Sequence, residues 1–175
     1  MRFLDSIKDR ISKWLLDEKF LVTQVDTAAV KGIAWGLNVS TPPPLNVKFA
    51  VLIPADMQDK VVLAMGIAIS PEHKAELEKL KQTERVKVVH SVLSRALIVC
   101  NDCKISVQPT LVDPATIVIN LELYKEELES HGKPLFMKSV IKLINTYLAI
   151  VSAFNEWFPI IPLHTGKGLV SEPFM

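Results

Sequence analysis

Hydrophobic residues change their spacing along this chain, and the changes divide it into helical and extended stretches. Residues 3–18 carry large apolar side chains three or four positions apart with charged residues between them, which is typical of an amphipathic helix. From Phe20 to Ser70 the large apolar residues fall at every second position, which predicts strands with one buried face. The breaks "STPPPLN" and "PADMQDK" interrupt this alternation. We therefore expect hairpin connections between antiparallel strands at both places.

The helical spacing returns at residue 70 and continues to about residue 100. Ser70 suits a helix N-cap, Pro71 suits the first helical position, and Glu72 suits the positive end of the helix dipole. We predict a long helix with a bend near Thr83. Its apolar stripe consists of Val86, Val89, Leu93, Leu97 and Cys100.

Two further strands, "KISVQ" and "TIVINLELY", precede a last helix over residues 134–158, which begins near Pro134 and ends at Pro159. The predicted order is thus helix, three or four strands, long helix, two strands, long helix. Because helices and strands are grouped rather than alternating, this order favours an α+β domain with a mostly antiparallel sheet. We assign residues 1–158 to this single domain and residues 159–175 to a C-terminal tail that can act as a covering arm.

The second face of the predicted sheet carries unusually small side chains. The positions opposite the large residues are Ala34, Gly36, Ala50, Ala64, Gly66 and Ala68. An antiparallel strand that faces solvent usually shows polar residues there, and small residues let another element approach closely. One interpretation is that a second subunit or the C-terminal tail covers this face. The other is that small residues relieve crowding in a twisted sheet.

The last predicted helix is apolar over most of its circumference, so nearly every side of it needs cover. One interpretation is a central core helix. The other is a helix shared between the core and an interface, with Phe154, Trp157 and Phe158 as aromatic anchors. Residues 140–158 are apolar over almost the length of a membrane span, but Lys142 and Glu156 favour a buried core helix over membrane insertion.

Composition and charge narrow the classes of function. The chain has 175 residues with 20 Lys and Arg against 19 Asp and Glu, a formal net charge of +1. This balance does not favour nucleic acid, an anionic membrane or an acidic substrate as partner. The first residues mix charged and apolar side chains and lack the apolar core of a signal peptide, so we expect a cytoplasmic protein.

The two cysteines, Cys100 and Cys103, form a Cys-x-x-Cys pair that suggests metal or redox chemistry. A structural zinc site needs four ligands, and the four histidines are scattered along the chain. A thioredoxin-like thiolate lies at a helix N-terminus, whereas Cys100 is predicted at a helix C-terminus before Asn101, where the dipole opposes a thiolate. We therefore favour two ordinary cysteines at a helix-to-strand junction, with no metal and no cofactor.

The element order resembles a known family. The segments that carry the likeness are "WLLDEKFLV" after the first helix, "SPEHKAELEKL" in the middle helix and "IVINLELYKEEL" before the last. Over residues 1 to about 158 the chain resembles the type III secretion chaperone-like fold, in its uncharacterised prokaryotic YbjN-like branch. The resemblance implies an α+β homodimer that holds partner polypeptides on apolar patches, and it implies no catalytic residues. The "STPPPLN" stretch and the tail depart from the family pattern.

The function favoured by these observations is a non-enzymatic binding or scaffolding module, a homodimer that binds protein or peptide by adding a strand at a sheet edge or through an apolar groove. The expected partner-binding residues are Phe154, Trp157, Phe158, Ala64 and Gly66. The alternative is a small-ligand-binding protein or a thiol-dependent enzyme that uses Cys100 and Cys103.

Overall fold

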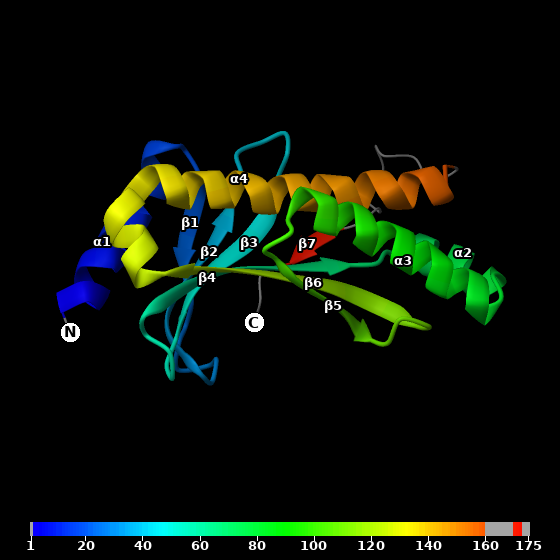
Figure 1. The fold of residues 1–175 in the computed structure, drawn as a ribbon, viewed down its shortest axis with the longest axis horizontal. Helices are drawn as coiled ribbons and strands as arrows, with labels where there is room; N and C mark the ends of the chain where they lie inside the picture. The colour runs from blue at the N-terminus through cyan, green and yellow to red at the C-terminus, as the bar shows by residue number, and fades with distance from the viewer. Residues whose placement is uncertain (1, 160–169, 173–175) are drawn as a thin grey trace. The chain divides into compact units, whose positions relative to one another are not determined.

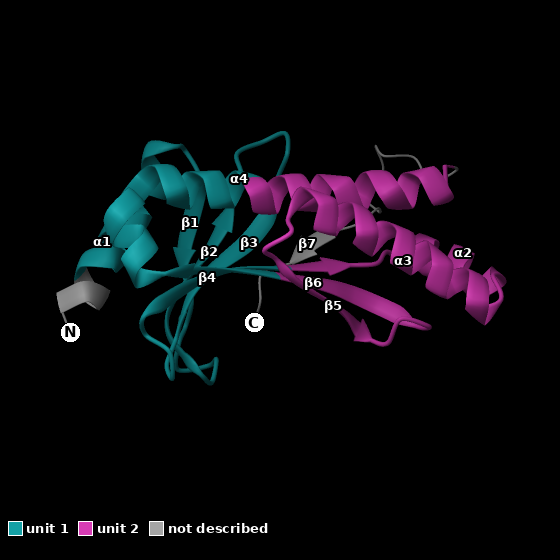
Figure 2. Ribbon diagram, viewed as in Figure 1, with its two compact units in different colours: residues 1–65, 120–141, 173–175 teal, residues 66–119, 142–172 magenta. Residues whose placement is uncertain are grey.

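A computed structural model describes the backbone of residues 2–159 and 170–172 and the side chains of residues 6–159. Figure 1 shows the path of the chain through its helices and strands. The chain forms two compact units, coloured in Figure 2. Unit 1 consists of residues 1–65, 120–141 and 173–175, and unit 2 of residues 66–119 and 142–172.

The elements alternate between groups of helices and groups of strands. In chain order they are α1 (Arg2–Asp17), β1 (Leu21–Gln24), β2 (Ile33–Ser40), β3 (Lys48–Pro54), β4 (Lys60–Ala68), α2 (Pro71–Lys79), α3 (Gln82–Val99), β5 (Lys104–Pro109), β6 (Pro114–Tyr124), α4 (Lys125–Trp157) and β7 (Val170–Glu172). The strand order is β1-β2-β3-β4-β6-β5, and β7 pairs with β4. The predicted α+β class, with an antiparallel sheet, an N-terminal helix and a long C-terminal helix, is confirmed.

Both predicted hairpins are present in unit 1. Strand β2 pairs antiparallel with β3, and β3 pairs antiparallel with β4. The first hairpin closes where Val47 N donates to Thr41 Oγ1 at 2.9 Å and Thr41 N donates to Val47 O at 2.9 Å. The alternating large residues form the core face, where Phe49, Val51 and Ile53 are fully buried. The period-two pattern therefore identified the buried face correctly.

The middle helix is divided into α2 and α3. Ser70 is the N-cap of α2 as predicted, and its hydroxyl accepts a hydrogen bond from His73 N at 3.2 Å. The break falls at Leu80 and Lys81, both in extended conformation, rather than at Thr83. Glu84 explains this position, because its side chain accepts from Lys81 N at 3.1 Å and caps the new helix.

The buried stripe of α3 differs from the predicted stripe. Val88, Val89, Val92, Ala96 and Cys100 are buried, whereas Leu97 is 45% exposed. Val89 and Cys100 belong to both stripes, and Val92 and Ala96 lie one residue before the predicted Leu93 and Leu97 on the same helix. The helix also ends one residue before the predicted position, with Cys100 rather than Asn101 as its C-cap.

Helix α4 consists of two helical segments joined at a kink at Gly132, and the second segment begins close to the predicted Pro134, after a short first segment that was not predicted. Gly132 interrupts it with φ +53°, a left-handed conformation that glycine adopts without a side-chain clash. Ile141 and Leu148 are exposed and lie seven residues apart on the same side of the helix, so this side is less covered than predicted. Among the described residues α4 alone is long and apolar enough to cross a membrane, and one such helix is weak evidence because core helices share these properties.

In unit 1, α1 packs against the first part of α4. The rings of Trp14 and Phe136 lie 5.6 Å apart between their centroids, and Phe136 is fully buried. At the surface, Lys133 Nζ lies 2.8 Å from a carboxylate oxygen of Glu18. The burial of Ile7 and Ile11 on α1 agrees with the amphipathic pattern.

In unit 2, His73 is buried among aromatic side chains. It is 1% exposed, and its ring centroid lies 5.4 Å from that of Phe154 and 6.1 Å from that of Phe158. The Ser70 hydroxyl lies 3.0 Å from Nδ1, and Nε2 is buried without a partner among the described residues. Burial lowers the pKa of His73 below its ordinary value of 6.5, and the charge of Glu72 partly opposes this.

We expect acid to destabilise the protein through His73 in a range where carboxylates still carry their charge. Because the pKa is lowered in the folded state, the unfolded chain binds a proton more readily, so the free energy of unfolding falls as pH drops below 6.5. The fall levels off below the pKa of the folded state. Urea unfolding across this range should show a shallower pH slope for His73→Gln. The exposed His90→Gln is the control, and an unchanged slope for His73→Gln would contradict the prediction.

Candidate functional site

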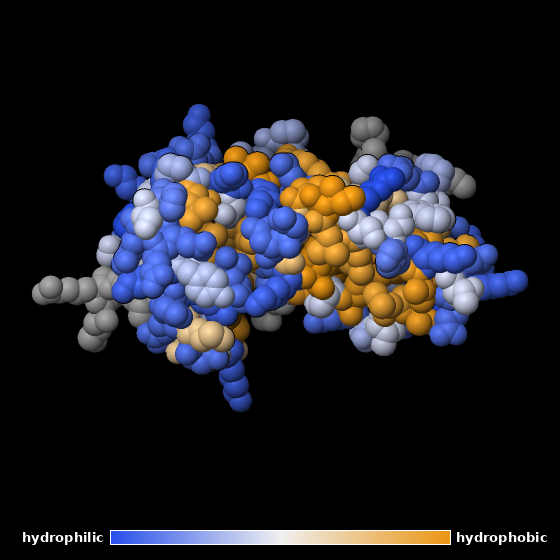
Figure 3. All heavy atoms as spheres, in the orientation of Figure 1, coloured by the Kyte–Doolittle hydropathy of each residue, from blue (hydrophilic) through white to orange (hydrophobic). Residues whose placement is uncertain are grey.

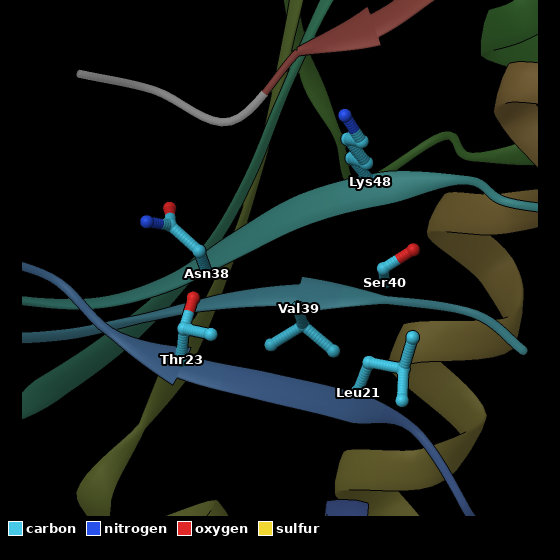
Figure 4. A pocket seen from close by; sticks show the side chains of 6 residues that line it. All are labelled: Leu21, Thr23, Asn38, Val39, Ser40 and Lys48. Atoms are coloured by element: carbon cyan, nitrogen blue, oxygen red, sulfur yellow. The ribbon is translucent and has the colours of Figure 1, made fainter.

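A groove opens on the surface of unit 1 at the first three strands. Its volume is about 270 Å³, and it is lined by Leu21 and Thr23 of β1, Asn38, Val39 and Ser40 of β2, and Lys48 of β3. The side chains of β1 and β3 project to the same side of the strands as Asn38 and Ser40, whereas Val39 points away (Figure 4). The groove therefore lies on the face opposite the large buried residues.

The strand register places these side chains in two rows across the strands. Leu21 lies opposite Ser40, which lies opposite Lys48. In the neighbouring row Thr23 lies opposite Asn38, and Asn38 lies opposite Ala50, which pairs with Ala64. The row of small residues that includes Ala50 and Ala64 thus continues across β2 and β1 into the groove.

The groove combines apolar side chains with polar groups that can form hydrogen bonds. Leu21 is 60% exposed, and the rest of the lining offers two hydroxyls, an amide and an ammonium group. Asn38 Oδ1 is buried and accepts no hydrogen bond from the described residues. Since a buried acceptor without a donor is costly, this atom is suited to a donor from a bound molecule.

Strand β1 is the first strand of the sheet order, and no described strand pairs with its outer edge. Three of its four residues are exposed. An open edge offers backbone N–H and C=O groups to an extended segment of another chain. The groove and this edge share Leu21 and Thr23, so one extended segment could contact both.

The small residues differ in what surrounds them. A Cβ added at Gly36 would lie 2.8 Å from Leu52 Cδ2 and 3.1 Å from Val25 Cγ2. Crowding within unit 1 therefore accounts for glycine at this position, in line with the second interpretation of the small face. Ala64 is 2% exposed, and Gly66 is buried with its backbone opposite Glu172 of β7.

The tail contributes a strand next to β4. Val170–Glu172 pairs antiparallel with the end of β4, from Ala68 to Gly66. This part of the tail extends the sheet sideways rather than lying across its face. Residues 160–169 and 173–175, on which the rest of the covering-arm prediction falls, lie outside the described residues.

The three predicted aromatic anchors have different surroundings. Phe154 is fully buried and Phe158 is 9% exposed, both in ring contact with His73 of the same unit. Trp157 is 47% exposed. Of the three, Trp157 alone has a large exposed surface, and the assignment of all three as anchors stays a prediction.

Cys100 and Cys103 form a disulfide, which the interpretation as two independent cysteines missed. Their Cα atoms lie 5.3 Å apart at the predicted helix-to-strand junction, because Cys103 N donates to Cys100 O and closes a tight turn. The spacing was the available signal. The arguments from zinc ligands and from the helix dipole address a metal site and a reactive thiolate, and neither bears on a disulfide between the two cysteines.

The surroundings of the disulfide do not favour thiol catalysis. Cys100 is fully buried and Cys103 is 7% exposed. Lys142 donates to both carboxylate oxygens of Asp102, at 2.9 and 2.8 Å, and this hydrogen bonding lowers the pKa of Asp102. The resulting carboxylate lies 3.4 Å from Cys100 Sγ and opposes a thiolate there.

Other candidate sites are weaker. A hollow of about 330 Å³ in unit 2 is lined by Leu148, Val151, Ser152, Asn155 and Glu156, which all belong to α4. Among the side chains that the structure describes, no three His, Cys, Asp or Glu residues are grouped so that they could hold a metal ion.

Comparison with known proteins places the chain in a family without assigning an activity. A crystal structure of an uncharacterized protein from Methanothermobacter thermautotrophicus has a TM-score of 0.75, with 19% sequence identity over 86% of this chain and 98% of that one. This likeness shows a shared fold. No curated protein matches the sequence. The family model described as "Uncharacterized conserved protein (DUF2299)" matches residues 7–154, and the chain therefore belongs to the DUF2299 family.

Proposed function

We propose that this protein is a non-enzymatic module that binds an extended polypeptide segment in the groove on unit 1. The observation that carries the proposal is Asn38 Oδ1, a buried acceptor with no donor among the described residues, at the wall of a groove beside a strand edge that no described strand covers. A backbone N–H of a peptide would supply the missing donor. The outer edge of β1 would pair with the same segment.

The size and lining of the groove support a peptide over a small ligand. A volume of about 270 Å³ lies at the lower end of the usual range of about 300–1,000 Å³ for small-molecule pockets. It suits one or two side chains of a longer segment. The other lining groups are two hydroxyls, an amide and the side chain of Lys48, which suit polar and backbone groups of a peptide.

The proposal keeps the chaperone-like role, the homodimer and the cytoplasmic location that the sequence suggested. The resemblance to the type III secretion chaperone-like fold supports a role in holding polypeptides, although neither comparison names that fold. The alternative of a thiol-dependent enzyme has less support because both sulfurs are buried and Asp102 opposes a thiolate.

Selection of phage-displayed random linear peptides on the purified protein tests the groove. We expect selected peptides to bind Leu21→Glu or Asn38→Leu about fivefold or more weakly than the wild type, since a lost hydrogen bond or a like-charge clash is worth about 1 kcal/mol or more. Affinity is measured by fluorescence polarisation of labelled peptides.

Met57→Glu is the matched control, because Met57 is 48% exposed in unit 1 and does not line the groove. It should bind the selected peptides as the wild type does. Failure to enrich any peptide, or equal binding by the wild type and Leu21→Glu, would contradict the proposal.

A further inference from the structure

An exposed apolar surface lies in unit 2, where α3 ends and β5 begins. Leu97 is 45% exposed, Ile98 83% and Val99 37%. The last turn of α3 contains no charged residue. In the space-filling view apolar residues gather over the end of α3 and the start of β5 (Figure 3). Nothing in the groove on unit 1 uses these residues.

The disulfide holds this surface together. The connection from Val99 to Lys104 has four residues, and the bond between Cys100 and Cys103 closes it. The last turn of α3 and the first residue of β5 are therefore kept close to each other. Strand β5 is the last strand of the sheet order, and no described strand pairs with its outer edge.

We propose that a second copy of this chain docks here, by antiparallel pairing of β5 with β5 about a twofold axis at Ser106. This inference deepens the homodimer part of the proposed function by naming its interface. A twofold contact uses the same patch on both copies, so the patch must complement itself. The two ends of β5 meet this requirement.

Exposed apolar residues lie at both ends of β5. Residues 97–99 precede β5 across the four-residue connection at one end, and Leu111, 46% exposed, follows Pro109 at the other. Antiparallel pairing brings the start of one strand beside the end of its partner. Ile98 of each copy would then face the partner's Leu111, which gives two identical apolar contacts.

The charged residues and the backbone N–H donors of β5 both favour the register centred on Ser106. With Ser106 opposite Ser106, Lys104 lies opposite the partner's Gln108, so the two lysines do not face each other. Centring the pair on Val107 instead would place Pro109 in the pairing, and Pro109 has no N–H to donate. The nearly uncharged surface also gives a charged partner such as nucleic acid little to bind.

The size of the surface predicts a dimer that dissociates on dilution. Residues 97–99, 104–109 and 111 make a smaller patch than the roughly 20–30 residues per side of a standard stable interface. We therefore expect dimers at high protein concentration and monomers at low concentration. Light scattering after size exclusion should show masses between one and two times 19.5 kDa.

Ile98→Lys tests the interface without unfolding the helix, because a cation near a helix C-terminus is favourable. We expect this variant to stay monomeric over the whole concentration series. Leu16→Lys is the matched control, since Leu16 is 60% exposed in the last turn of α1 and should leave the dimer intact. A wild type that is monomeric throughout, or dimers that persist in Ile98→Lys, would overturn the inference.

Cysteine cross-linking tests the register. After oxidation with diamide, Ser106→Cys should give a covalent dimer on a non-reducing gel, whereas Gln108→Cys should give much less because it faces the partner's Lys104. Equal cross-linking would overturn the proposed pairing. The peptide selection described above is independent of this test: Ile98→Lys should retain peptide binding, and Leu21→Glu should retain the dimer.

Discussion

Replacing Phe154 with alanine is expected to lower the free energy of unfolding by about 3–5 kcal/mol, because truncating a buried aromatic ring removes its packing and leaves a cavity. Phe154 is fully buried and contacts the ring of His73. In a chain of this length the loss corresponds to a fall in melting temperature of roughly 6–20 °C. Urea denaturation and thermal melting both measure it.

Trp157→Ala is the matched control for Phe154→Ala. Trp157 lies three residues further along α4 and is 47% exposed, so its truncation should change stability by less than about 1 kcal/mol. If Phe154→Ala were as stable as the wild type, the burial of this ring would be wrong. A loss of partner binding in Trp157→Ala without a loss of stability would support Trp157 as an anchor.

Replacing Lys60 with methionine is expected to destabilise unit 1 by about 2–3 kcal/mol. Lys60 Nζ donates to Glu122 Oε1 at 2.9 Å, and the two side chains are only 9% and 17% exposed. This hydrogen bond raises the pKa of Lys60 above 10.5, although burial opposes the shift. Removing the Lys60 ammonium leaves the mostly buried carboxylate of Glu122 without its ion-pair partner. The expected cost is smaller than for a fully buried pair because water still reaches part of the Glu122 side chain.

A double variant separates the ion pair from the packing of its side chains. Lys60→Met combined with Glu122→Leu should recover most of the loss, since an apolar pair of similar volume often replaces a buried ion pair without a large cost. Lys79→Met is the control, because Lys79 pairs with Glu76 at the surface and should change stability by less than about 0.5 kcal/mol. A double variant no more stable than Lys60→Met would argue against this account.

The Lys60 contribution also has a defined pH range. Because the pKa is raised in the folded state, the stabilisation is fully present below pH 10.5 and is lost as pH rises through the raised pKa. The His73 effect has the opposite dependence and acts below pH 6.5. The two ranges do not overlap, so one series of unfolding measurements can resolve both.

Periodicity predicted the elements whose two faces differ. The core side chains of β3, such as Phe49 and Val51, and those of α1, such as Ile7 and Ile11, are buried as the spacing indicated. The N-cap at Ser70 was also predictable, because a hydroxyl followed by proline and an acidic residue is a local signal. Such signals act over a few residues and need no distant partner.

The sequence predicted the small residues beside the groove but not the groove itself. The small residues were visible as a row, and their continuation into Leu21, Thr23 and Asn38 depends on the register between β1 and β2. A register is set by the connecting loop and by cross-strand pairing, and the spacing of residues within each strand does not contain it. Sequence spacing therefore did not predict that Asn38 Oδ1 would be buried without a hydrogen-bond donor among the described residues.

The sequence by itself determined the class of the fold, the core face of the strands and the helix starts that local capping residues specify. The break before α3 and the disulfide at its end also had local signals, the Glu84 cap and the Cys-x-x-Cys spacing. Tertiary structure alone decided the burial of Phe154 against His73 and the exposure of Ile98. The physical reason is that side-chain spacing specifies which residues share a face, whereas the neighbours of that face come from contacts between distant segments of the chain.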